Sequence, residues 1–551
     1  MKAAKLFVKC LENENVEFIF GIPGEENLDV MDALLDSKIK FITTRHEQGA
    51  AYMADVYGRL TGKPGVCLST LGPGATNLVT GVADANMDNA PLVAIAGQAG
   101  TSRLHKESHQ VVDLISMFKP ITKYAAQVLE PNTIPEIVRK AFKLAEAEKP
   151  GATFIDLPEN VVELDSLEMP LPVSVNRLTF ADKALVNEAA QLVKKAKNPL
   201  ILVGNGAVRS RASEDIKQFI DTHKIPVVNS FMAKGVIPFS HDMAMGTAGL
   251  QKGDYENGGF AKADLIICVG FDMVEYHPHL WNPNKGHTLI HIDTKKAEVD
   301  SSYIPDIELI GNIGKNFALL GETLTEVCSG PINQTSISFL LRNSMVEEME
   351  RCQNSDDWPM LPQKIIWDLR TAMDSSDIAI SDVGSHKMWM ARMFRCDEPN
   401  TCIISNGFAG MGIAVPGAVA AKLAYPKKGV VAVTGDAGFM MNSQEIETAI
   451  RCQTPIVILI WNDSQYGLIE WKQQRRFGRS AYIDFKNPDF VQYAKSFGAE
   501  GIRIESANRL LPELKKALQL NTVTVIDCPV DYSQNDRLTT LLGNILSEIE
   551  G

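Results

Sequence analysis

A chain of 551 residues is too long for one ordinary hydrophobic core, and its length predicts about three domains. Hydrophobic residues make up 45% of the chain and charged residues 22%, which is the balance of a globular protein and excludes a disordered or fibrous one. The 54 lysines and arginines are outnumbered by 67 aspartates and glutamates, so the net charge of −13 argues against a nucleic-acid partner or an anionic membrane surface. Any anionic ligand must therefore be held by local groups.

The N-terminal segment and the cysteines favour a cytoplasmic enzyme. Lysines at the start of the chain are followed by Glu12 and Glu14 before an apolar signal region can form, so we expect an amphipathic helix there. No uncharged apolar run approaches about 18 residues, the length expected of a transmembrane helix. The nine cysteines are scattered singly, as expected of reduced thiols in the cytoplasm.

Three stretches of the chain alternate short apolar runs with helical segments, the pattern of βαβ units in a parallel sheet. In residues 1–165 the runs are VEFIFGIPG, KFITT, GVCLST, PLVAIAG and ATFIDLP. Residues 185–330 contain PLILVGNG, PVVNS, ADLIICVG and TLIHID, and residues 360–530 contain DIAISDVG, TCIISNG, GVVAVTGDAG, PIVILIW and VTVIDCP. The predicted fold class is α/β, with three doubly wound parallel-sheet domains followed by a C-terminal tail at 531–551.

Two apolar runs of the third stretch end in acidic residues, Asp436 after GVVAVTG and Asp463 after PIVILIWN. One helical crossover separates them, so both are expected at the carboxyl edge of neighbouring parallel strands, where open α/β sheets bind ligands. Two carboxylates, a backbone carbonyl and phosphate oxygens would form a Mg²⁺ site, and Gly435 and Gly438 would let the backbone approach the phosphate. The alternative is ordinary turn chemistry at two strand ends, which the pairing of the two aspartates disfavours.

The motif GDA at 435–437 followed by WND at 461–463 resembles the metal and diphosphate motif of thiamine-diphosphate enzymes, whose usual form is GDG followed by two asparagines. Ala437 and Asp463 depart from that form, but an aspartate is as good an oxygen ligand as an asparagine. The resemblance implies that Asp436, Asp463 and the carbonyl of Gln465 bind Mg²⁺. It implies further that the cofactor is held by residues of the same region: Gly435, Ala437, Gly438 and Tyr466.

The run RHEQGAAYMADVYGR at 45–59 resembles the family segment that carries the catalytic glutamate. By this resemblance Glu47 hydrogen-bonds the aminopyrimidine ring of the cofactor and drives removal of the thiazolium proton. A bland alternative is an acidic residue in the first turn of a helix, which the helix dipole favours. Met411 matches the hydrophobic wedge that holds the cofactor bent, against the alternative of a core methionine. His386 matches a residue near the diphosphate, against the alternative of a capping histidine.

Four longer segments extend the resemblance over nearly the whole chain, to the acetolactate synthase branch of the family. They are FGIPGEENL at 20–28, LGPGATNLVTGVADANMDNAPLVAIAGQ at 71–98, DVGSHKMWMAR at 382–392 and SNGFAGMGIAVPGAVAAKLA at 405–424. The resemblance implies a pyrimidine-binding domain at 1–165, a central domain at 185–330 and a diphosphate-binding domain at 360–530. It also implies an active site shared between two chains, hence a homodimer or a homotetramer.

The implied reaction condenses two molecules of pyruvate to 2-acetolactate and CO₂ through a hydroxyethyl carbanion on the cofactor. The segment 268–312 is similar to the catabolic type, which is independent of FAD, and this type is favoured. Against it, Trp471 stands where the biosynthetic, FAD-containing type carries a specificity tryptophan, so 2-oxobutyrate as acceptor and a bound flavin stay open. Lys106 and Gln110 match residues that line the substrate channel, although a solvated lysine on a helix is an equal alternative.

Two other functions compete with the synthase. A simple 2-oxoacid decarboxylase would protonate the carbanion, but its adjacent histidines have no counterpart here, since His105 and His109 are separated. An inactive paralogue kept as an assembly subunit would have no need of Glu47, Asp436 and Asp463. The GNG at 204–206 is too short to indicate a dinucleotide site, because a lone G-x-G is usually a strand-to-helix turn.

Overall fold

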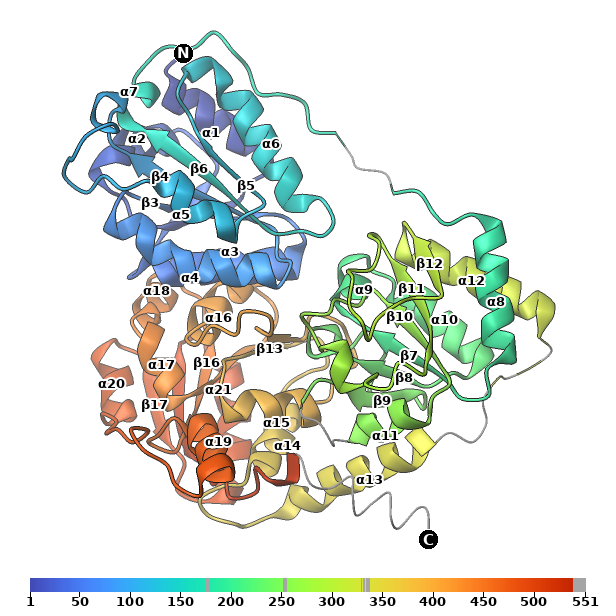
Figure 1. Ribbon diagram of the computed structural model, residues 1–551. Coiled ribbons are helices and arrows are strands. Elements are labelled where there is room, and N and C mark those ends of the chain that lie inside the picture. The colour runs from blue at the N-terminus through green and yellow to red at the C-terminus, as the bar shows by residue number, and fades with distance from the viewer. Residues whose placement is uncertain (175–177, 251–254, 329, 331, 333–336, 539–551) are drawn as a thin grey trace.

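The computed structural model describes the whole chain except residues 175–177, 251–254, 329, 331, 333–336 and 539–551. Three lobes are visible, each built around a six-stranded sheet in which every paired strand is parallel (Figure 1). The predicted α/β class with three parallel-sheet domains is therefore confirmed. In the described part of the chain, no helix combines the length and the apolar character needed to cross a membrane.

The first domain has the strand order β2-β1-β3-β4-β6-β5. Its strands are β1 (Phe18–Gly21), β2 (Lys40–Thr43), β3 (Gly65–Ser69), β4 (Leu92–Gln98), β5 (Tyr124–Gln127) and β6 (Ala152–Pro158). Its helices are α1 (Ala3–Asn13), α2 (Leu28–Leu35), α3 (Glu47–Thr61), α4 (Pro73–Met87), α5 (Leu114–Phe118), α6 (Ile134–Glu146) and α7 (Glu159–Val162). Every residue of β3, β4 and β6 is buried, as expected of inner strands covered on both faces.

The central domain has the order β12-β11-β10-β7-β8-β9. Its strands are β7 (Pro199–Val203), β8 (Val227–Asn229), β9 (Ala244–Thr247), β10 (Leu265–Val269), β11 (Thr288–Asp293) and β12 (Ile307–Ile310). Its helices are α8 (Lys183–Lys195), α9 (Asn205–Arg209), α10 (Ser213–His223), α11 (Tyr255–Lys262) and α12 (Ile313–Val327), and α13 (Ile337–Arg351) connects it to the third domain. This strand order is that of dinucleotide-binding sheets.

The third domain repeats the strand order of the first, as β14-β13-β15-β16-β18-β17. Its strands are β13 (Ile378–Ser381), β14 (Cys402–Ile404), β15 (Val430–Gly435), β16 (Val457–Asn462), β17 (Glu500–Arg503) and β18 (Thr524–Pro529). Its helices are α14 (Pro362–Ala372), α15 (Ser385–Met393), α16 (Ala414–Ala424), α17 (Asp436–Asn442), α18 (Glu445–Arg451), α19 (Gly467–Phe477), α20 (Phe490–Ser496) and α21 (Leu510–Gln519). Of the predicted C-terminal tail, residues 531–538 lie against this domain and residues 539–551 lie outside the described part.

The first and third domains share one hydrophobic core, which we call the shared core. It includes Tyr52 and Val56 of α3 together with Ala414 and Ala418 of α16. Figure 1 shows α16 and α18 next to α3 and α4. Helix α3 is buried along nearly its whole length, because one side packs on its own sheet and the other on the third domain. This packing explains why even the polar residues Glu47 and Asp55 of this helix are buried.

A buried charge cluster, formed by Arg59 and three aspartates, lies at the edge of the shared core. The guanidinium of Arg59 lies 2.8 Å from Asp55, 2.9 Å from Asp84 and 2.8 Å from Asp88, and the three carboxylates have no solvent exposure. Backbone and side-chain donors of residues 405–410 in the third domain bond to Asp84 and Asp88. The cluster therefore joins two domains as well as neutralising its own charges.

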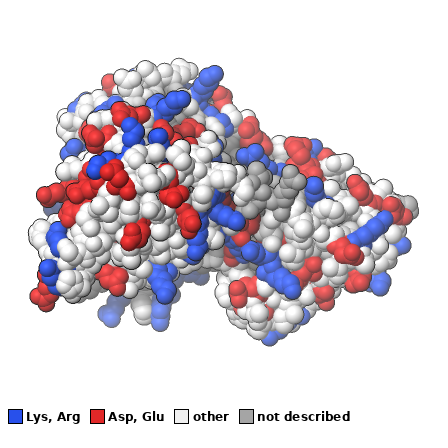
Figure 2. Space-filling view, turned by 90° about the horizontal axis from the view of Figure 1, so that it is seen from above, with Lys and Arg blue, Asp and Glu red and all other residues white. Residues whose placement is uncertain are grey.

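On the surface, charges of both signs are intermixed. On the face in Figure 2, lysine and arginine side chains are interspersed with aspartates and glutamates over both visible lobes. This face presents no broad area of basic residues.

We expect Arg59→Leu to lower the free energy of unfolding by about 3–5 kcal/mol, because three buried carboxylates would lose their counter-charge. Urea unfolding followed by tryptophan fluorescence measures the change. Lys5→Ala is the control, since Lys5 pairs with Asp36 in an exposed ion pair worth about 1 kcal/mol at most. Equal losses in the two variants would contradict a special role for the Arg59 cluster.

Candidate active site

A cavity of about 190 Å³ opens at the carboxyl edge of the third sheet. It is bounded by the segments that follow β13, β14, β15 and β16, by the start of α19 and by Tyr532 after β18. All the metal and cofactor residues that the sequence predicts in the third domain line it: His386, Met411, Gly435, Asp436, Ala437, Gly438, Asp463, Gln465 and Tyr466. Residues from four separate loops are thus brought together at one place.

Asp436 and Asp463 are neighbours because β15 and β16 pair in parallel, with Gly435 opposite Trp461. The carboxylate of Asp436 accepts hydrogen bonds from the backbone N–H groups of Ala437 and Ser464, at 2.8 and 2.7 Å. The Oδ2 atom of Asp463 is buried and has no hydrogen-bond partner among the described residues. Burial, followed by the charge of Asp436, raises the pKa of Asp463 to about 7. A cation between the two carboxylates would relieve both effects, so the residues fit a metal.

The chemistry of the donors also indicates which kind of metal would fit. Among the described residues, no three His, Cys, Asp or Glu side chains gather into a metal-binding cluster. The remaining ligands would have to be neutral oxygens, such as the carbonyl of Gln465, or oxygens of a bound phosphate. Oxygen ligands completed by phosphate are what Mg²⁺ takes in proteins.

The other side of the cavity suits an anion. Helix α15 begins at the cavity, directly after Gly384. The free N–H groups of its first turn therefore lie at the cavity, where they could bind an anion. Burial lowers the pKa of His386 to about 3, so its imidazole is neutral, and the buried Nε2 has no partner among the described residues. Gly438 packs closely on Asp382, since a Cβ added there would lie 2.9 Å from the carboxylate. The helix start and the imidazole could thus supply donors for a diphosphate, whereas the space beside Gly438 is filled by Asp382.

Met411 is held in the cavity wall by contacts that the sequence did not reveal. Its carbonyl accepts a hydrogen bond from the hydroxyl of Tyr52, at 3.3 Å, across the domain interface. The next turn is fastened by the buried carboxylate of Asp382, which accepts from the N–H groups of Gly412 and Ala414 at 2.8 and 3.1 Å. Asp382 follows the apolar strand β13, the same signal that pointed to Asp436 and Asp463.

Asn487 is a second residue that the sequence did not single out. Its side-chain amide donates to Asp436 at 2.7 Å and to Asn462 at 3.0 Å. Asn462 in turn donates to Asp527 at 2.9 Å, and Asp527 accepts from Arg503 at 2.6 Å. This chain of hydrogen-bonded polar groups fixes the orientation of the Asp436 carboxylate. No periodic pattern marks Asn487, because it lies in the loop between α19 and α20.

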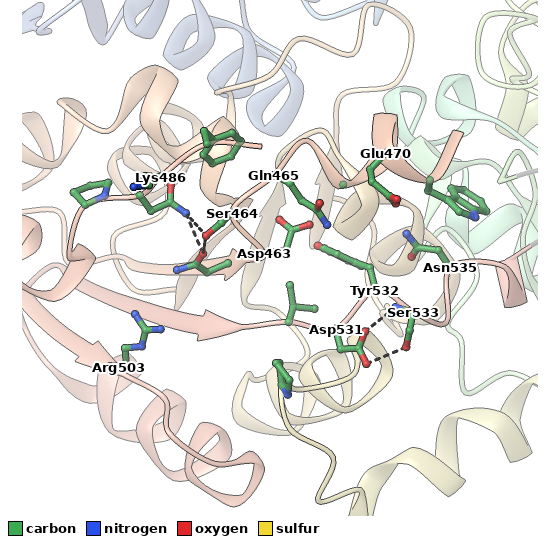
Figure 3. A pocket seen from close by; sticks show the side chains of 18 residues that line it. Asp463, Ser464, Gln465, Glu470, Lys486, Arg503, Asp531, Tyr532, Ser533 and Asn535 are labelled. Atoms are coloured by element: carbon green, nitrogen blue, oxygen red, sulfur yellow. Dashed lines mark hydrogen bonds between the residues drawn. The ribbon is translucent and has the colours of Figure 1, made fainter. Parts of the chain in front are cut away.

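A wider pocket of about 950 Å³ adjoins the cavity and shares Asp463, Gln465 and Tyr532 with it. In Figure 3, Gln465 and Tyr532 point toward Asp463, and Lys486, Arg503 and Asp531 lie further out. Trp471 lines this wider pocket and not the smaller cavity. Its indole nitrogen donates to Asp536 at 2.7 Å, so its ring is fixed against the segment after β18.

The predicted site residues of the first domain, Glu47, Lys106 and Gln110, do not line this cavity. Glu47 is the first residue of α3, is 9% exposed and accepts a hydrogen bond from Asn77 at 2.9 Å. Lys106 and Gln110 lie in the exposed loop between β4 and α5. The described residues that line the cavity all come from the third domain, so a single chain does not bring these three side chains into it.

Three family matches cover the three domains in order. Residues 1–117 match the family described as thiamine pyrophosphate enzyme, N-terminal TPP binding domain. Residues 186–320 match the central domain of thiamine pyrophosphate enzymes, and residues 382–528 match their C-terminal TPP binding domain. The cavity lies within the last of these regions.

Relatives resemble the chain over nearly its full length. An acetolactate synthase of Bacillus subtilis is 38% identical over 98% of this chain and 95% of its own length. A catabolic acetolactate synthase of Raoultella terrigena is 35% identical over 97% of this chain and 96% of its own. A probable acetolactate synthase large subunit of Methanocaldococcus jannaschii is 35% identical over 97% and 93%. Identity of this extent, together with the three domain matches, shows that the chain belongs to the acetolactate synthase family of thiamine pyrophosphate enzymes.

Proposed function

We propose that the protein is an acetolactate synthase, a transferase that condenses two molecules of pyruvate to 2-acetolactate and CO₂ with thiamine diphosphate and Mg²⁺. The observation that carries the proposal is the pair of aspartates at the carboxyl edge of the third sheet, where the buried Oδ2 atom of Asp463 has no partner among the described residues. The names of the full-length relatives support the reaction itself.

The residues of the cavity divide the work of holding the cofactor. Asp436, Asp463 and the carbonyl of Gln465 would bind Mg²⁺ together with the diphosphate. Met411 would contact the cofactor, and Glu47 of a second chain would hydrogen-bond its aminopyrimidine ring. The bound cofactor supplies the electron sink that decarboxylation of a 2-oxoacid needs. The protein contributes placement and exclusion of water.

The central domain does not fit a flavin, although its strand order is that of dinucleotide-binding sheets. In such sheets the diphosphate lies on the loop after the first strand, here Gly204 to Gly206 after β7. A Cβ added at Gly204 would lie 2.5 Å from the carbonyl of Gly270 and 2.7 Å from Glu275. The chain itself therefore covers the loop.

The carboxylate of Glu275 occupies the position at the loop after β7 where the diphosphate of a dinucleotide would bind. Glu275 is 4% exposed, and its carboxylate accepts the N–H groups of Asn205, at 3.0 Å, and Asp272, at 3.1 Å, as well as the hydroxyl of Ser230. A flavin diphosphate would have to displace this buried carboxylate. We therefore propose that the enzyme works without FAD, like the catabolic type.

We place the enzyme in the cytoplasm and propose that it acts as a homodimer or homotetramer. All nine cysteines are free, and six of them are buried, which suits a reducing compartment. The cavity belongs to the third domain, whereas Glu47, Lys106 and Gln110 belong to the first. A second copy would supply these side chains to the cavity of the first, so each chain would contribute to two active sites.

The reaction is tested with purified protein, thiamine diphosphate, Mg²⁺ and pyruvate, after an absorbance scan for flavin. We expect acetoin after acid treatment, which reports acetolactate, and no flavin band. Acetaldehyde as the only product would indicate a decarboxylase. A flavin band on which activity depends would indicate the biosynthetic type, and 2-oxobutyrate would then be tested as acceptor.

We expect Glu47→Gln to lower kcat for pyruvate by about 10²-fold or more, because the amide cannot exchange a proton with the cofactor ring. The control is Glu12→Gln, which changes a glutamate of α1 in the same domain. Steady-state rates at saturating cofactor measure the effect. A Glu47→Gln enzyme as active as wild type would remove Glu47 from the mechanism.

The shared active site is tested by mixing two inactive variants, Glu47→Gln and Asp463→Ala. A heterodimer of the two would contain one intact site, built from Glu47 of one chain and Asp463 of the other. Co-expression with two affinity tags isolates this heterodimer, and we expect about half of the wild-type activity per dimer. No recovery of activity, or an active monomer on a sizing column, would contradict the shared site.

A further inference from the structure

Glu445 is a fully buried carboxylate at the interface between the first and third domains. It is the first residue of α18 in the third domain, yet its Oε1 atom accepts the backbone N–H groups of Arg45 and His46, both at 3.1 Å. Its Oε2 atom accepts from the N–H of Arg45 at 3.3 Å and from the hydroxyl of Thr448 at 2.6 Å. Both oxygens are thus engaged, and two of their donors directly precede Glu47.

The segment from Arg45 to Glu47 needs such an acceptor. It joins β2 to α3, and the N–H groups at the start of a helix have no partner inside the helix. His46 is the N-cap residue, and its ring nitrogen accepts from the N–H of Gln48 at 3.1 Å. The N–H groups of Arg45 and His46 themselves are satisfied by Glu445, across the domain interface. Charge-assisted bonds of this kind are stronger than neutral ones.

Gly49 provides the space that the contact needs. A Cβ added at Gly49 would lie 2.7 Å from Oε1 of Glu445, closer than side-chain atoms normally approach. The carboxylate therefore packs against the first turn of α3 at Gly49, which has no side chain to block it. Burial raises the pKa of Glu445 to about 7, and the bonds from Thr448, Arg45 and His46 oppose that rise.

We propose that Glu445 is a positioning residue for Glu47. By binding the N–H groups of Arg45 and His46, it fixes the junction between β2 and α3 from which the side chain of Glu47 projects. Among the described residues, one hydrogen bond holds the side chain of Glu47, that from Asn77, so its direction depends strongly on the backbone of the first turn of α3. The inference rests on the proposed function, in which Glu47 acts on the aminopyrimidine ring of thiamine diphosphate.

The first test uses the cofactor-free protein and the variant Glu445→Gln. The amide of glutamine keeps the size of the side chain, but it carries no charge and has one oxygen where the carboxylate has two. Hydrogen exchange of the backbone amides of Arg45 and His46, followed by mass spectrometry, is expected to become at least about tenfold faster. The control is Glu513→Gln, the same change in the first turn of α21, where the carboxylate pairs with Arg509.

The second test uses the enzyme loaded with thiamine diphosphate and Mg²⁺, without pyruvate. Exchange of the thiazolium proton of the bound cofactor with deuterium, measured by NMR after acid quench, is expected to slow about tenfold or more in Glu445→Gln. The Kd of the cofactor is expected to stay within about threefold of wild type. Glu47→Gln is the reference variant and is expected to slow the same exchange at least as much.

The two tests separate the possible failures. Slow proton exchange in Glu47→Gln with normal exchange in Glu445→Gln would overturn the positioning role alone. Normal exchange in both variants would overturn the proposed role of Glu47. If Glu445→Gln does not fold, Gly49→Ala addresses the same contact from the side of α3, because its methyl group would displace the carboxylate. Unchanged amide and proton exchange in Gly49→Ala would overturn the proposal.

Discussion

The mutual repulsion of two neighbouring carboxylates, Asp436 and Asp463, is the interaction on which the candidate site depends. Asp436 and Asp463 are brought together because β15 and β16 are parallel neighbours, so their carboxyl ends meet at one edge. Asp436 is buried, and Asp463 is half-buried, with its Oδ2 atom buried and without a partner among the described residues. The arrangement is costly without a cation and favourable with one. The rest of the cavity, with its neutral histidine and exposed helix end, is suited to the anion that such a cation would bring.

The apolar pattern predicted the three sheets but not all of their strands. The strands that it missed are β5, β9, β12 and β17, and each lies at an edge of its sheet. An edge strand has a neighbour on one side only and is covered less completely, so its sequence need not be a continuous apolar run. β17 shows this most clearly, since none of its residues is buried. Inner strands such as β16 could not be mistaken, because burial on both faces demands apolar side chains throughout.

The sequence predicted which residues meet at the cavity where their place follows from a strand end, and missed residues whose place follows from contacts distant in the sequence. Asp436 and Asp463 were found by the first criterion, and Asp382 could have been found by it as well. Glu445 and Asn487 could not, because their partners lie on other elements and no spacing connects them. The central domain gives the same lesson: its strand order suggests a dinucleotide, and only the position of Glu275 argues against one.

The shared core has a consequence for how the molecule loses its structure. Because α3 and α16 belong to one hydrophobic cluster, the first and third domains cannot separate without exposing each other's interior. The central domain has clusters of its own, but its Phe231 and Leu250 belong to a further cluster with Trp389 of the third domain, and polar contacts such as Lys149 with Asp272 join it to the first domain. On heating, the first and third domains should therefore melt as one cooperative unit, and loss of the central domain would uncover apolar side chains of the third.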